Sequence, residues 1–244
     1  MDIFSDTYNF SKRLAVLVDP DEYKEKNLAQ LANYAKEGWI QLFLVGGSLL
    51  VKNHMSLVVD YLKEHCDVPV IIFPGDPTQI YEGADGLLLL SLISGRNPEL
   101  LIGRHVEASM GIKRSGLTIT PTGYILVDGG KITSVSYISN TTPIPSDKPD
   151  IAVATALAGE QLGLKAIYLE AGSGALRPIP TEMISKIRAT ISLPILVGGG
   201  IKTKAQVMSA FQAGADVVVI GNAIEKDPTL IQSVAIERAT SIKI

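Results

Sequence analysis

One carboxylate in this chain stands where a buried strand opens into a run of small residues. An apolar segment from Leu164 to Leu169 leads into it, and the stretch Tyr168–Gly174 reads Tyr-Leu-Glu-Ala-Gly-Ser-Gly. Glu170 therefore ends a predicted strand, where its carboxylate could take a proton from a substrate. The turn that follows can direct backbone N–H groups toward an anion. An ion pair or a helix cap is the alternative role for Glu170, and its place beside a Gly-Ser turn favours a general base.

Two further glycine turns follow later strand-like segments, at Gly198–Gly200 and at Gly221–Asn222. Taken singly, such a turn most often serves a tight reversal of the chain. Three of them at successive strand ends instead predict that backbone N–H groups hold a phosphate. Together with one candidate base, they indicate an enzyme that acts on a phosphorylated small molecule.

Two residues with hard oxygen ligands, Asp19 and Ser48, stand at the ends of two earlier predicted strands. Carboxylate and hydroxyl oxygens suit Mg²⁺ that keeps several waters and also binds substrate phosphate oxygens. The alternative is that the Asp-Pro-Asp sequence forms a turn that caps the next helix, a role that fits Asp21 better than Asp19. A metal site at one side of the molecule and glycine turns at the other imply two phosphate-bearing substrates.

Apolar runs alternate with helix-like segments along the whole chain. Eight continuous apolar runs are typical of strands buried on both faces of a parallel sheet: Leu14–Val18, Ile40–Val45, Val70–Phe73, Leu87–Ser91, Gly116–Thr120, Ala166–Glu170, Ile195–Val197 and Val217–Ile220. The predicted helices lie between or after them: Tyr23–Glu37, Asn53–His65, Pro98–Ser109, Asp150–Leu162, Pro180–Thr190, Lys202–Ala213 and Pro228–Ala239. Thr203 and Gln206 predict a capping box. This alternation predicts an α/β fold, a closed (β/α)8 TIM barrel in a single domain that spans residues 1–244.

Two segments depart from the repeating pattern. The segment Pro74–Asp85 is short and holds two prolines and two glycines, so we expect a loop in place of the third crossover helix. The missing helix would leave an apolar groove lined by Phe73, Tyr81 and Leu92 that could hold a hydrocarbon tail, although ordinary core packing of these residues is the alternative. In the long segment after Thr120, Tyr124–Asp128 and Lys131–Ile138 predict a strand pair around a glycine turn.

Composition limits the remaining function classes. The net charge is −3 without a cluster of Lys or Arg, which argues against nucleic-acid binding. Cys66 is the single cysteine and the three histidines are scattered, so neither a disulfide nor a histidine-cysteine metal site is expected. Apolar runs all fall short of the ~18 residues needed to span a bilayer. We expect a soluble, cytoplasmic protein without stable membrane insertion.

Six motifs together resemble the geranylgeranylglyceryl phosphate synthase family, in order and with fitting spacings. They are Val18–Asp21, Val45–Ser48, Phe73–Gly75, Tyr168–Gly174, Gly198–Ile201 and Gly221–Ala223. The resemblance implies a (β/α)8 prenyltransferase whose third helix is replaced by a loop. Such an enzyme uses Mg²⁺ to transfer the prenyl group of a prenyl diphosphate to the 3-hydroxyl of sn-glycerol 1-phosphate, and it releases diphosphate. The donor expected for this chain is geranylgeranyl diphosphate. The resemblance also implies a homo-oligomer, either a dimer or a hexamer.

The family's site residues can be carried over by motif. The resemblance assigns Asp19 and Ser48 to Mg²⁺ and makes Glu170 the catalytic base that takes the hydroxyl proton. It assigns the following residues to glycerol 1-phosphate: Tyr168, Leu169, Glu170, Ala171, Gly172, Ser173, Gly174, Gly199, Gly200, Gly221 and Asn222. Some bacterial relatives that transfer a heptaprenyl group carry a lysine where this chain has Leu17, which favours the geranylgeranyl branch.

Two other functions fit parts of the same pattern. Another phosphate-binding barrel, such as an isomerase or synthase, would show a catalytic lysine or a second acid at a strand end, and Lys165 precedes its strand instead. A non-catalytic barrel that senses a phosphorylated metabolite would bind without Mg²⁺-dependent turnover. The set Asp19, Ser48 and Glu170 argues against the second possibility.

Overall fold

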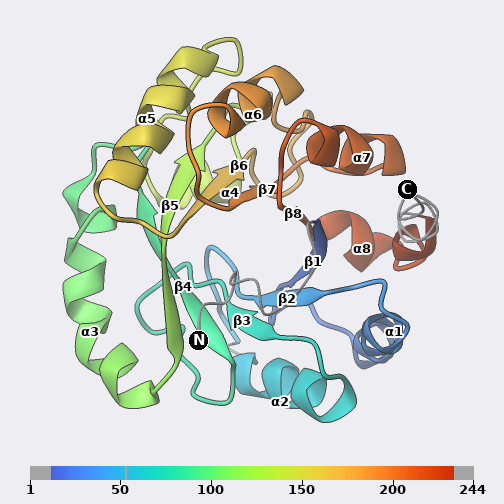
Figure 1. Ribbon diagram of the computed structural model, residues 1–244. Coiled ribbons are helices and arrows are strands. Elements are labelled where there is room, and N and C mark those ends of the chain that lie inside the picture. The colour runs from blue at the N-terminus through green and yellow to red at the C-terminus, as the bar shows by residue number, and fades with distance from the viewer. Residues whose placement is uncertain (1–11, 53, 234–244) are drawn as a thin grey trace.

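The computed structural model describes residues 12–52 and 54–233. Eight parallel strands close into a barrel in sequence order, and the first strand pairs with the last. The strands are β1 (Arg13–Val18), β2 (Leu42–Val45), β3 (Val70–Ile72), β4 (Gly86–Leu92), β5 (Thr118–Leu126), β6 (Ala166–Glu170), β7 (Ile195–Gly198) and β8 (Val217–Ile220). Figure 1 looks into this barrel and shows the helices in a ring around it. The predicted TIM barrel is confirmed.

The helices differ widely in length. They are α1 (Glu25–Lys36), α2 (Met55–His65), the 3₁₀ turn η1 (Pro98–Leu100), α3 (Gly103–Ser115), α4 (Ser134–Ile138), α5 (Pro149–Gln161), α6 (Thr181–Arg188), α7 (Lys204–Gln212) and α8 (Asn222–Lys226). At the start of α7 the N–H of Gln206 donates to Thr203 Oγ1 (3.3 Å), and the N–H of Thr203 donates to Gln206 Oε1 (3.1 Å). The predicted capping box is therefore confirmed.

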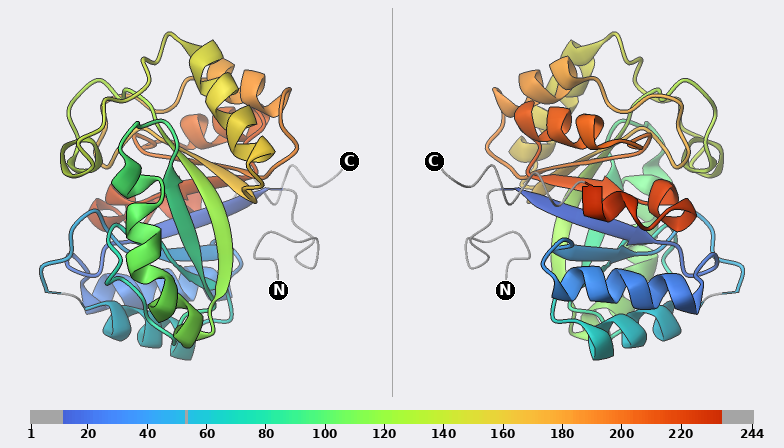
Figure 2. Two further views of the ribbon diagram at one scale, coloured as in Figure 1. Left: turned by 90° about the vertical axis from the view of Figure 1, so that its left-hand side faces the viewer. Right: turned by 90° about the vertical axis from the view of Figure 1, so that its right-hand side faces the viewer.

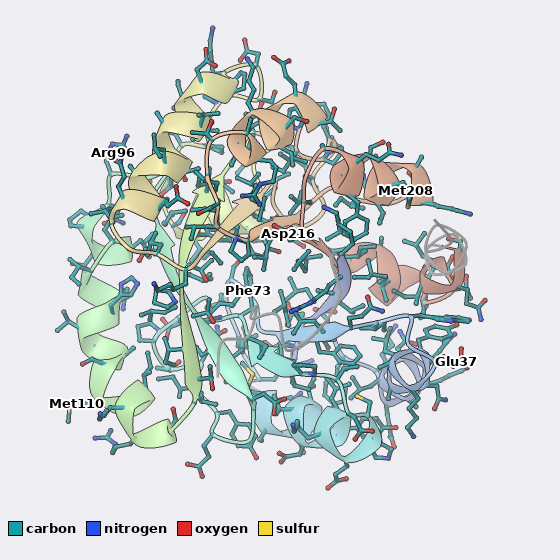
Figure 3. All side chains as sticks on the ribbon, viewed as in Figure 1. Glu37, Phe73, Arg96, Met110, Met208 and Asp216 are labelled. Carbon is teal, nitrogen blue, oxygen red and sulfur yellow. The ribbon has the colours of Figure 1, made fainter. Side chains whose placement is uncertain are left out.

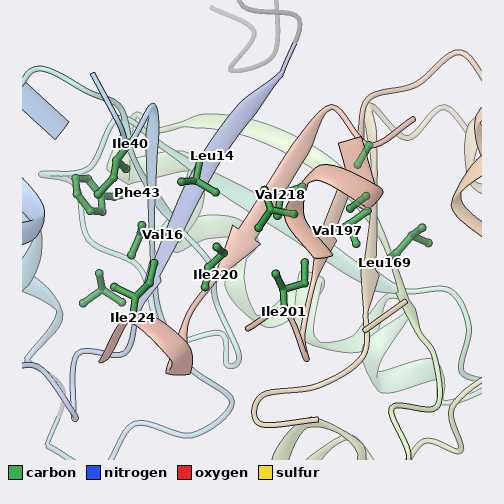
Figure 4. Close-up of a cluster of buried hydrophobic side chains, with 14 of the residues drawn as sticks. Leu14, Val16, Ile40, Phe43, Leu169, Val197, Ile201, Val218, Ile220 and Ile224 are labelled. Carbon is green, nitrogen blue, oxygen red and sulfur yellow. The ribbon is translucent and has the colours of Figure 1, made fainter. Parts of the chain in front are cut away.

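Alternation along the strands divides the core into two layers. Inside the barrel, Ala15, Leu42, Tyr168 and Val219 belong to one buried cluster. Between the sheet and the helices a larger cluster fills the space, and Figure 4 shows part of it, including Leu14, Val16, Ile40, Phe43, Leu169, Val197, Ile201, Val218, Ile220 and Ile224. Burial on both faces explains why these strands are continuous apolar runs.

The chain passes from β3 to β4 without a helix, as predicted from Pro74–Asp85. The whole of this connection is described, and it consists of turns, bends and irregular segments. Asp85 secures its end, because one carboxylate oxygen accepts the N–H of Val70 (2.8 Å) and the other accepts from Lys63 Nζ (2.6 Å). Seen from the side in Figure 2, α3 runs along β4 and β5. The flank beside β4 is thus covered by α3 and a loop.

The predicted strand pair Tyr124–Asp128 and Lys131–Ile138 is wrong. β5 continues to Leu126 as one long parallel strand that pairs with β4 and β6. The second half forms helix α4, whose start is closed by the N–H of Thr133 donating to Ser136 Oγ (3.0 Å). Pairing with two long neighbours buries the apolar run after Gly123 better than a hairpin with one partner could.

The helices also differ from the prediction in two places. The segment predicted as one helix, Pro98–Ser109, divides into η1 and α3, because Asn97 Oδ1 accepts the N–H of Glu99 (3.1 Å) and closes a separate short turn. Helix α8 directly follows β8 and was not predicted. The predicted helix Pro228–Ala239 lies partly outside the described residues. None of the helices in the described part of the chain is both long and apolar enough to cross a membrane.

Candidate active site

Glu170 ends β6 and faces the inside of the barrel mouth, where its side chain is only 5% exposed. Its Oε1 accepts the N–H of Gly172 at 2.6 Å. Across the sheet it pairs with Gly198, and the next residue, Gly199, has a φ of +81°. A Cβ on Gly199 would lie 2.3 Å from Glu170 Oε1. The glycine is therefore required both for the left-handed turn and for the space that the carboxylate occupies.

The surroundings of Glu170 adapt it to proton transfer. Burial raises its pKa from 4.5 to about 7, opposed by the Gly172 N–H and by the nearby hydroxyls of Tyr168 and Tyr124. The Tyr168 hydroxyl is buried and has no hydrogen-bond partner among the described groups. Burial also raises the pKa of both tyrosines well above the ordinary value, so they remain protonated. A carboxyl with a pKa near the working pH can both accept and return a proton.

A cavity of about 200 Å³ opens beside Glu170 at the ends of β6, β7 and β8. The structure brings eight of the predicted substrate-binding residues together in its lining: Tyr168, Glu170, Ser173, Gly174, Gly199, Gly200, Gly221 and Asn222. The Ser173 hydroxyl contacts Asn222 Oδ1 and so joins the loop after β6 to the start of α8. Backbone turns at three strand ends surround one space, as an anion site of the P-loop kind requires.

Leu169, Ala171 and Gly172 do not line this cavity. Leu169 and Ala171 pack in the core between the sheet and the helices, because their side chains alternate with those that face inward. Gly172 adopts a φ of +95°, and a Cβ there would lie 2.4 Å from Thr133 Oγ1. These three residues support the turn, and their contact with glycerol phosphate stays a prediction.

Two lysines near the cavity were missed by the sequence analysis. Lys202 lines the cavity, together with Leu17. Lys131 places its Nζ 3.4 Å from the position that a Cβ on Gly174 would take. The signal for Lys202 was its place directly after the Gly-Gly-Gly-Ile motif, whereas Lys131 comes from a distant loop. Ammonium groups at the rim increase the attraction of the cavity for a phosphate.

Asp19 follows β1 and turns its carboxylate toward the loop that carries Ser48. Its Oδ1 accepts the N–H of Asp21 at 2.9 Å, and a Cβ on Gly47 would lie 3.0 Å from its Oδ2. Burial raises the pKa of Asp19, and the charges of Asp21 and Glu22 raise it further against the opposing hydrogen bond from Asp21. A cation at this position would stabilise the ionised carboxylate of Asp19 and so offset both the cost of its burial and the repulsion from its acidic neighbours.

The donor set fits Mg²⁺ better than a metal that needs a full protein cage. In the described residues there is no group of three or more His, Cys, Asp or Glu side chains that could hold a metal ion. Asp19 and Ser48 supply hard oxygens on neighbouring strands, and Mg²⁺ characteristically completes its shell with water and substrate phosphate. Asp21 does not cap α1, whose N-cap is Lys24; its carboxylate accepts the N–H of Val51 and of Lys52.

An apolar groove of about 250 Å³ lies beside β3 and β4, where the crossover helix is missing. Phe73 and Leu92 line it as expected, but Tyr81 does not, because its hydroxyl donates to Asp60 (2.8 Å). Most of the other lining side chains are aliphatic: Leu49, Ile80, Leu87, Leu89, Leu90, Leu100, Ala108, Ile112, Val135 and Ile138. Gly47 and Ser48 also line it, so one side of the groove reaches the candidate metal ligands.

Three aromatic rings connect the groove to the cavity. The centroids of Tyr124 and Phe73, which line the groove, lie 5.4 Å and 5.1 Å from that of Tyr168, which lines the cavity. Phe73 lies near the middle of the barrel in Figure 3. Glu170 sits at this junction, in contact range of both tyrosines. A long apolar molecule in the groove and a small phosphate in the cavity would therefore meet beside one buried carboxylate.

Comparison with known proteins gives consistent matches over most of the chain. The model of the PcrB family matches residues 9–238. Geranylgeranylglyceryl phosphate synthase of Chitinophaga pinensis is 51% identical over 92% of this chain and 89% of its own length. The protein of the same name from Thermococcus kodakarensis is 40% identical over 86% of this chain and 83% of its own.

Solved structures give the same result. One is the (S)-3-O-geranylgeranylglyceryl phosphate synthase of Thermoplasma acidophilum in complex with its substrate sn-glycerol-1-phosphate. It has a TM-score of 0.87 at 28% identity and covers 96% of this chain and 94% of that chain. The protein from Thermoplasma volcanium has a TM-score of 0.86 at 31% identity with the same coverage. A tryptophan synthase α-subunit from Pyrococcus furiosus, at 12% identity and a TM-score of 0.60, shares the fold alone.

Proposed function

The chain belongs to the PcrB family and is a prenyltransferase, and we propose that it forms the ether bond between sn-glycerol 1-phosphate and a prenyl diphosphate. The 3-hydroxyl of the glycerol attacks the first carbon of the prenyl chain, and diphosphate leaves. The observation that carries the proposal is the position of Glu170, buried between a cavity lined with glycine turns and an apolar groove.

Glu170 acts as the general base in this proposal. With its pKa raised to about 7, it is present as carboxylate in a large fraction of molecules at neutral pH and binds a proton more strongly than an exposed glutamate. The glycine turns hold the phosphate so that the glycerol hydroxyl lies against Oε1 or Oε2. Proximity of the two reactants then supplies much of the acceleration. The proton of the hydroxyl passes to Glu170 as the carbon–oxygen bond forms.

Asp19 and Ser48 would hold Mg²⁺ together with the diphosphate. When bound, Mg²⁺ neutralises the leaving diphosphate and so promotes departure of the leaving group. The side chains would put this charge beside the groove, because the Asp19 carboxylate faces the Gly47–Ser48 turn, which lines the groove. The apolar lining excludes water from the reactive prenyl carbon and limits hydrolysis.

Geranylgeranyl diphosphate is the proposed donor. The relatives named geranylgeranylglyceryl phosphate synthase support this choice, and so does Leu17, which lines the cavity where some heptaprenyl-transferring relatives carry a lysine. Side chains that line the groove would limit the chain length. The groove's aliphatic side chains match a branched hydrocarbon in polarity.

A transfer assay tests the proposal directly. The purified protein is incubated with sn-glycerol 1-phosphate, Mg²⁺ and farnesyl, geranylgeranyl or heptaprenyl diphosphate, and the products are identified by mass spectrometry. We expect a geranylgeranyl ether of glycerol phosphate that disappears with EDTA and is much reduced with sn-glycerol 3-phosphate. Absence of any ether product with all three donors would overturn the proposal.

A homo-oligomer is also proposed, as a dimer or a hexamer. Exposed apolar side chains on α3 and at the residue before it support this proposal: Ile102, Val106 and Met110 are each 60% or more exposed. Such a patch on a helix is more often covered by another protein surface than left in water. Light scattering coupled to size-exclusion chromatography measures the mass, and a monomer at micromolar concentration would contradict the proposal.

A further inference from the structure

The loops after β2 and β3 approach each other so closely that their contact needs glycine on both sides. A Cβ on Gly46 would lie 2.0 Å from the carbonyl oxygen of Phe73. A Cβ on Gly75 would lie 2.2 Å from the carbonyl oxygen of Gly47. Backbone therefore packs directly against backbone at the mouth of the groove, beside Ser48.

One buried side chain ties these two loops together. Gln79 is only 3% exposed. Its Oε1 accepts the N–H of Gly75 at 3.1 Å, and its Nε2 donates to the carbonyl oxygen of Gly47 at 3.0 Å. A carboxamide can donate and accept at the same time, which neither a carboxylate nor an aliphatic side chain can do.

The loop itself fixes the position of Gln79. The Gln79 N–H donates to the carbonyl oxygen of Asp76 (3.0 Å), and Asp76 Oδ1 accepts the N–H of Thr78 (2.9 Å). These turns belong to the segment that replaces the third crossover helix. The loop therefore does more than leave the groove open, because it carries an anchor to the neighbouring strand end.

The anchored turn is the one that faces the candidate metal ligand. Gly47 directly precedes Ser48, and the space beside Gly47 is closed by Asp19 Oδ2, 3.0 Å from where a Cβ would lie. Gly47, Ser48, Phe73 and Gly75 all line the groove, whereas Gln79 lines neither the groove nor the cavity beside Glu170. Gln79 thus contacts the backbone of the Gly47–Ser48 turn on the donor side, but it does not contact the space proposed for either substrate.

We propose that Gln79 is a positioning residue for the prenyl diphosphate, whose carboxamide holds the Gly47–Ser48 turn at the Asp19 carboxylate and at the groove mouth. The inference rests on the proposed function, because it assigns the donor diphosphate to this side of the barrel. Losing the two hydrogen bonds frees the turn, so Ser48 and Asp19 no longer keep one fixed geometry. Use of the donor and of Mg²⁺ should suffer, while the glycerol phosphate cavity keeps its shape.

Gln79→Met tests this, because methionine fills a similar volume and makes neither hydrogen bond. The matched control is Gln41→Met. Gln41 also bridges two backbone groups, accepting the N–H of Leu14 (2.8 Å) and donating to the carbonyl of Gly38, but it precedes β2 at the opposite end of the barrel. Steady-state kinetics give KM for each substrate and the Mg²⁺ concentration at half-maximal rate, and thermal melting reports stability.

For Gln79→Met we expect KM for geranylgeranyl diphosphate and the half-maximal Mg²⁺ concentration each to rise about tenfold, the scale of one or two lost buried hydrogen bonds. KM for sn-glycerol 1-phosphate should change less than about twofold. Gln41→Met should lower the melting temperature by a similar amount and leave all three constants unchanged. Gln79→Glu keeps the bond from Gly75 and loses the donation to Gly47, so it should show the same donor-specific defect if Gln79→Met does not fold.

Two results would overturn the role of Gln79. Either all constants stay at wild-type values, or both KM values change equally and in proportion to the loss of stability; Gln79 is then a structural anchor only. A wild-type protein that forms no ether with any donor would instead overturn the proposed function, and this inference with it. The wild-type assay therefore separates the two failures.

Discussion

The two halves of the barrel mouth build their candidate binding sites from different parts of the chain. On the β6–β8 side, the cavity is made largely of backbone turns, with Gly199, Gly200 and Gly221 bringing main-chain atoms to its surface. On the β1–β4 side, side chains make the site: Asp19 and Ser48 at the mouth, and aliphatic residues along the groove. In the proposed function, the first side holds a small anion by its main chain. The second side would take a long apolar molecule, in the space left where one crossover helix is missing.

Glu170 lies between these halves, and replacing it should have the largest effect. Glu170→Gln keeps the shape and can still accept the Gly172 N–H, but it cannot take a proton. We expect turnover to fall by about 10²–10⁴-fold, the usual contribution of a general base. KM for glycerol phosphate should change much less, because in the proposed function the glycine turns hold the phosphate. Near wild-type turnover would remove Glu170 from the mechanism, and an equal loss of binding and turnover would make it a substrate-positioning residue.

Gly199→Ala should disrupt the cavity on the β6–β8 side, which is made largely of backbone turns. The new Cβ would lie 2.3 Å from Glu170 Oε1 at a φ of +81°. We expect kcat/KM for glycerol phosphate to fall by about 10²-fold, since displacement of a reacting group by about 1 Å has that cost. Gly163→Ala is the control, because Gly163 has a similar φ of +87° with nothing within 4 Å. It should lose about 1–2 kcal/mol of stability from the left-handed conformation and keep full activity. Equal activity losses in the two variants would contradict the role given to Gly199.

Asp19→Asn should weaken the side-chain half alone. An oxygen ligand remains, but its charge is lost, and Mg²⁺ depends on carboxylate charge. We expect the half-maximal Mg²⁺ concentration and KM for the prenyl diphosphate to rise about 10–100-fold, the scale of one charged contact. KM for glycerol phosphate should stay near the wild-type value. Unchanged Mg²⁺ dependence would mean that Asp19 is a turn residue.

The smallest expected effect is on the pH dependence of activity and stability, which tests the role of Glu170 between the two halves. Because the pKa of Glu170 is about 7, kcat/KM should fall below pH 7 as the base becomes protonated. The same raised pKa favours the folded state below the ordinary value of 4.5, and this contribution is lost as the pH rises through 7. The side chain introduced by Glu170→Gln cannot ionise, so the stability of the variant lacks this pH dependence. The free energy of unfolding of the variant minus that of wild type should therefore rise by about 1–3 kcal/mol from pH 4 to pH 8. Denaturant unfolding at both pH values measures the gain, and parallel pH profiles of the two proteins would contradict it.

Local pattern determined most of the barrel and the identity of its central residues. β6 and β8 have the bounds that the apolar runs predicted, because strands buried on both faces carry their signal within a few residues. The missing third helix followed from the Pro and Gly content and the length of Pro74–Asp85, which are also local properties. Glu170 and the glycine turns were found in the same way, from an acid and small residues at strand ends.

Contacts between distant segments decided what the sequence could not. The apolar run after Gly123 fits a hairpin locally, and only its pairing with β4 and β6 makes it the end of β5. Tyr81 is an aromatic residue in the loop that replaces the third helix, but its hydroxyl donates to Asp60 and the side chain does not line the groove. The pKa of Glu170 and the bridge made by Gln79 depend on burial and on partners from other strand ends. Such properties arise from distances in three dimensions, and a one-dimensional pattern contains no measure of them.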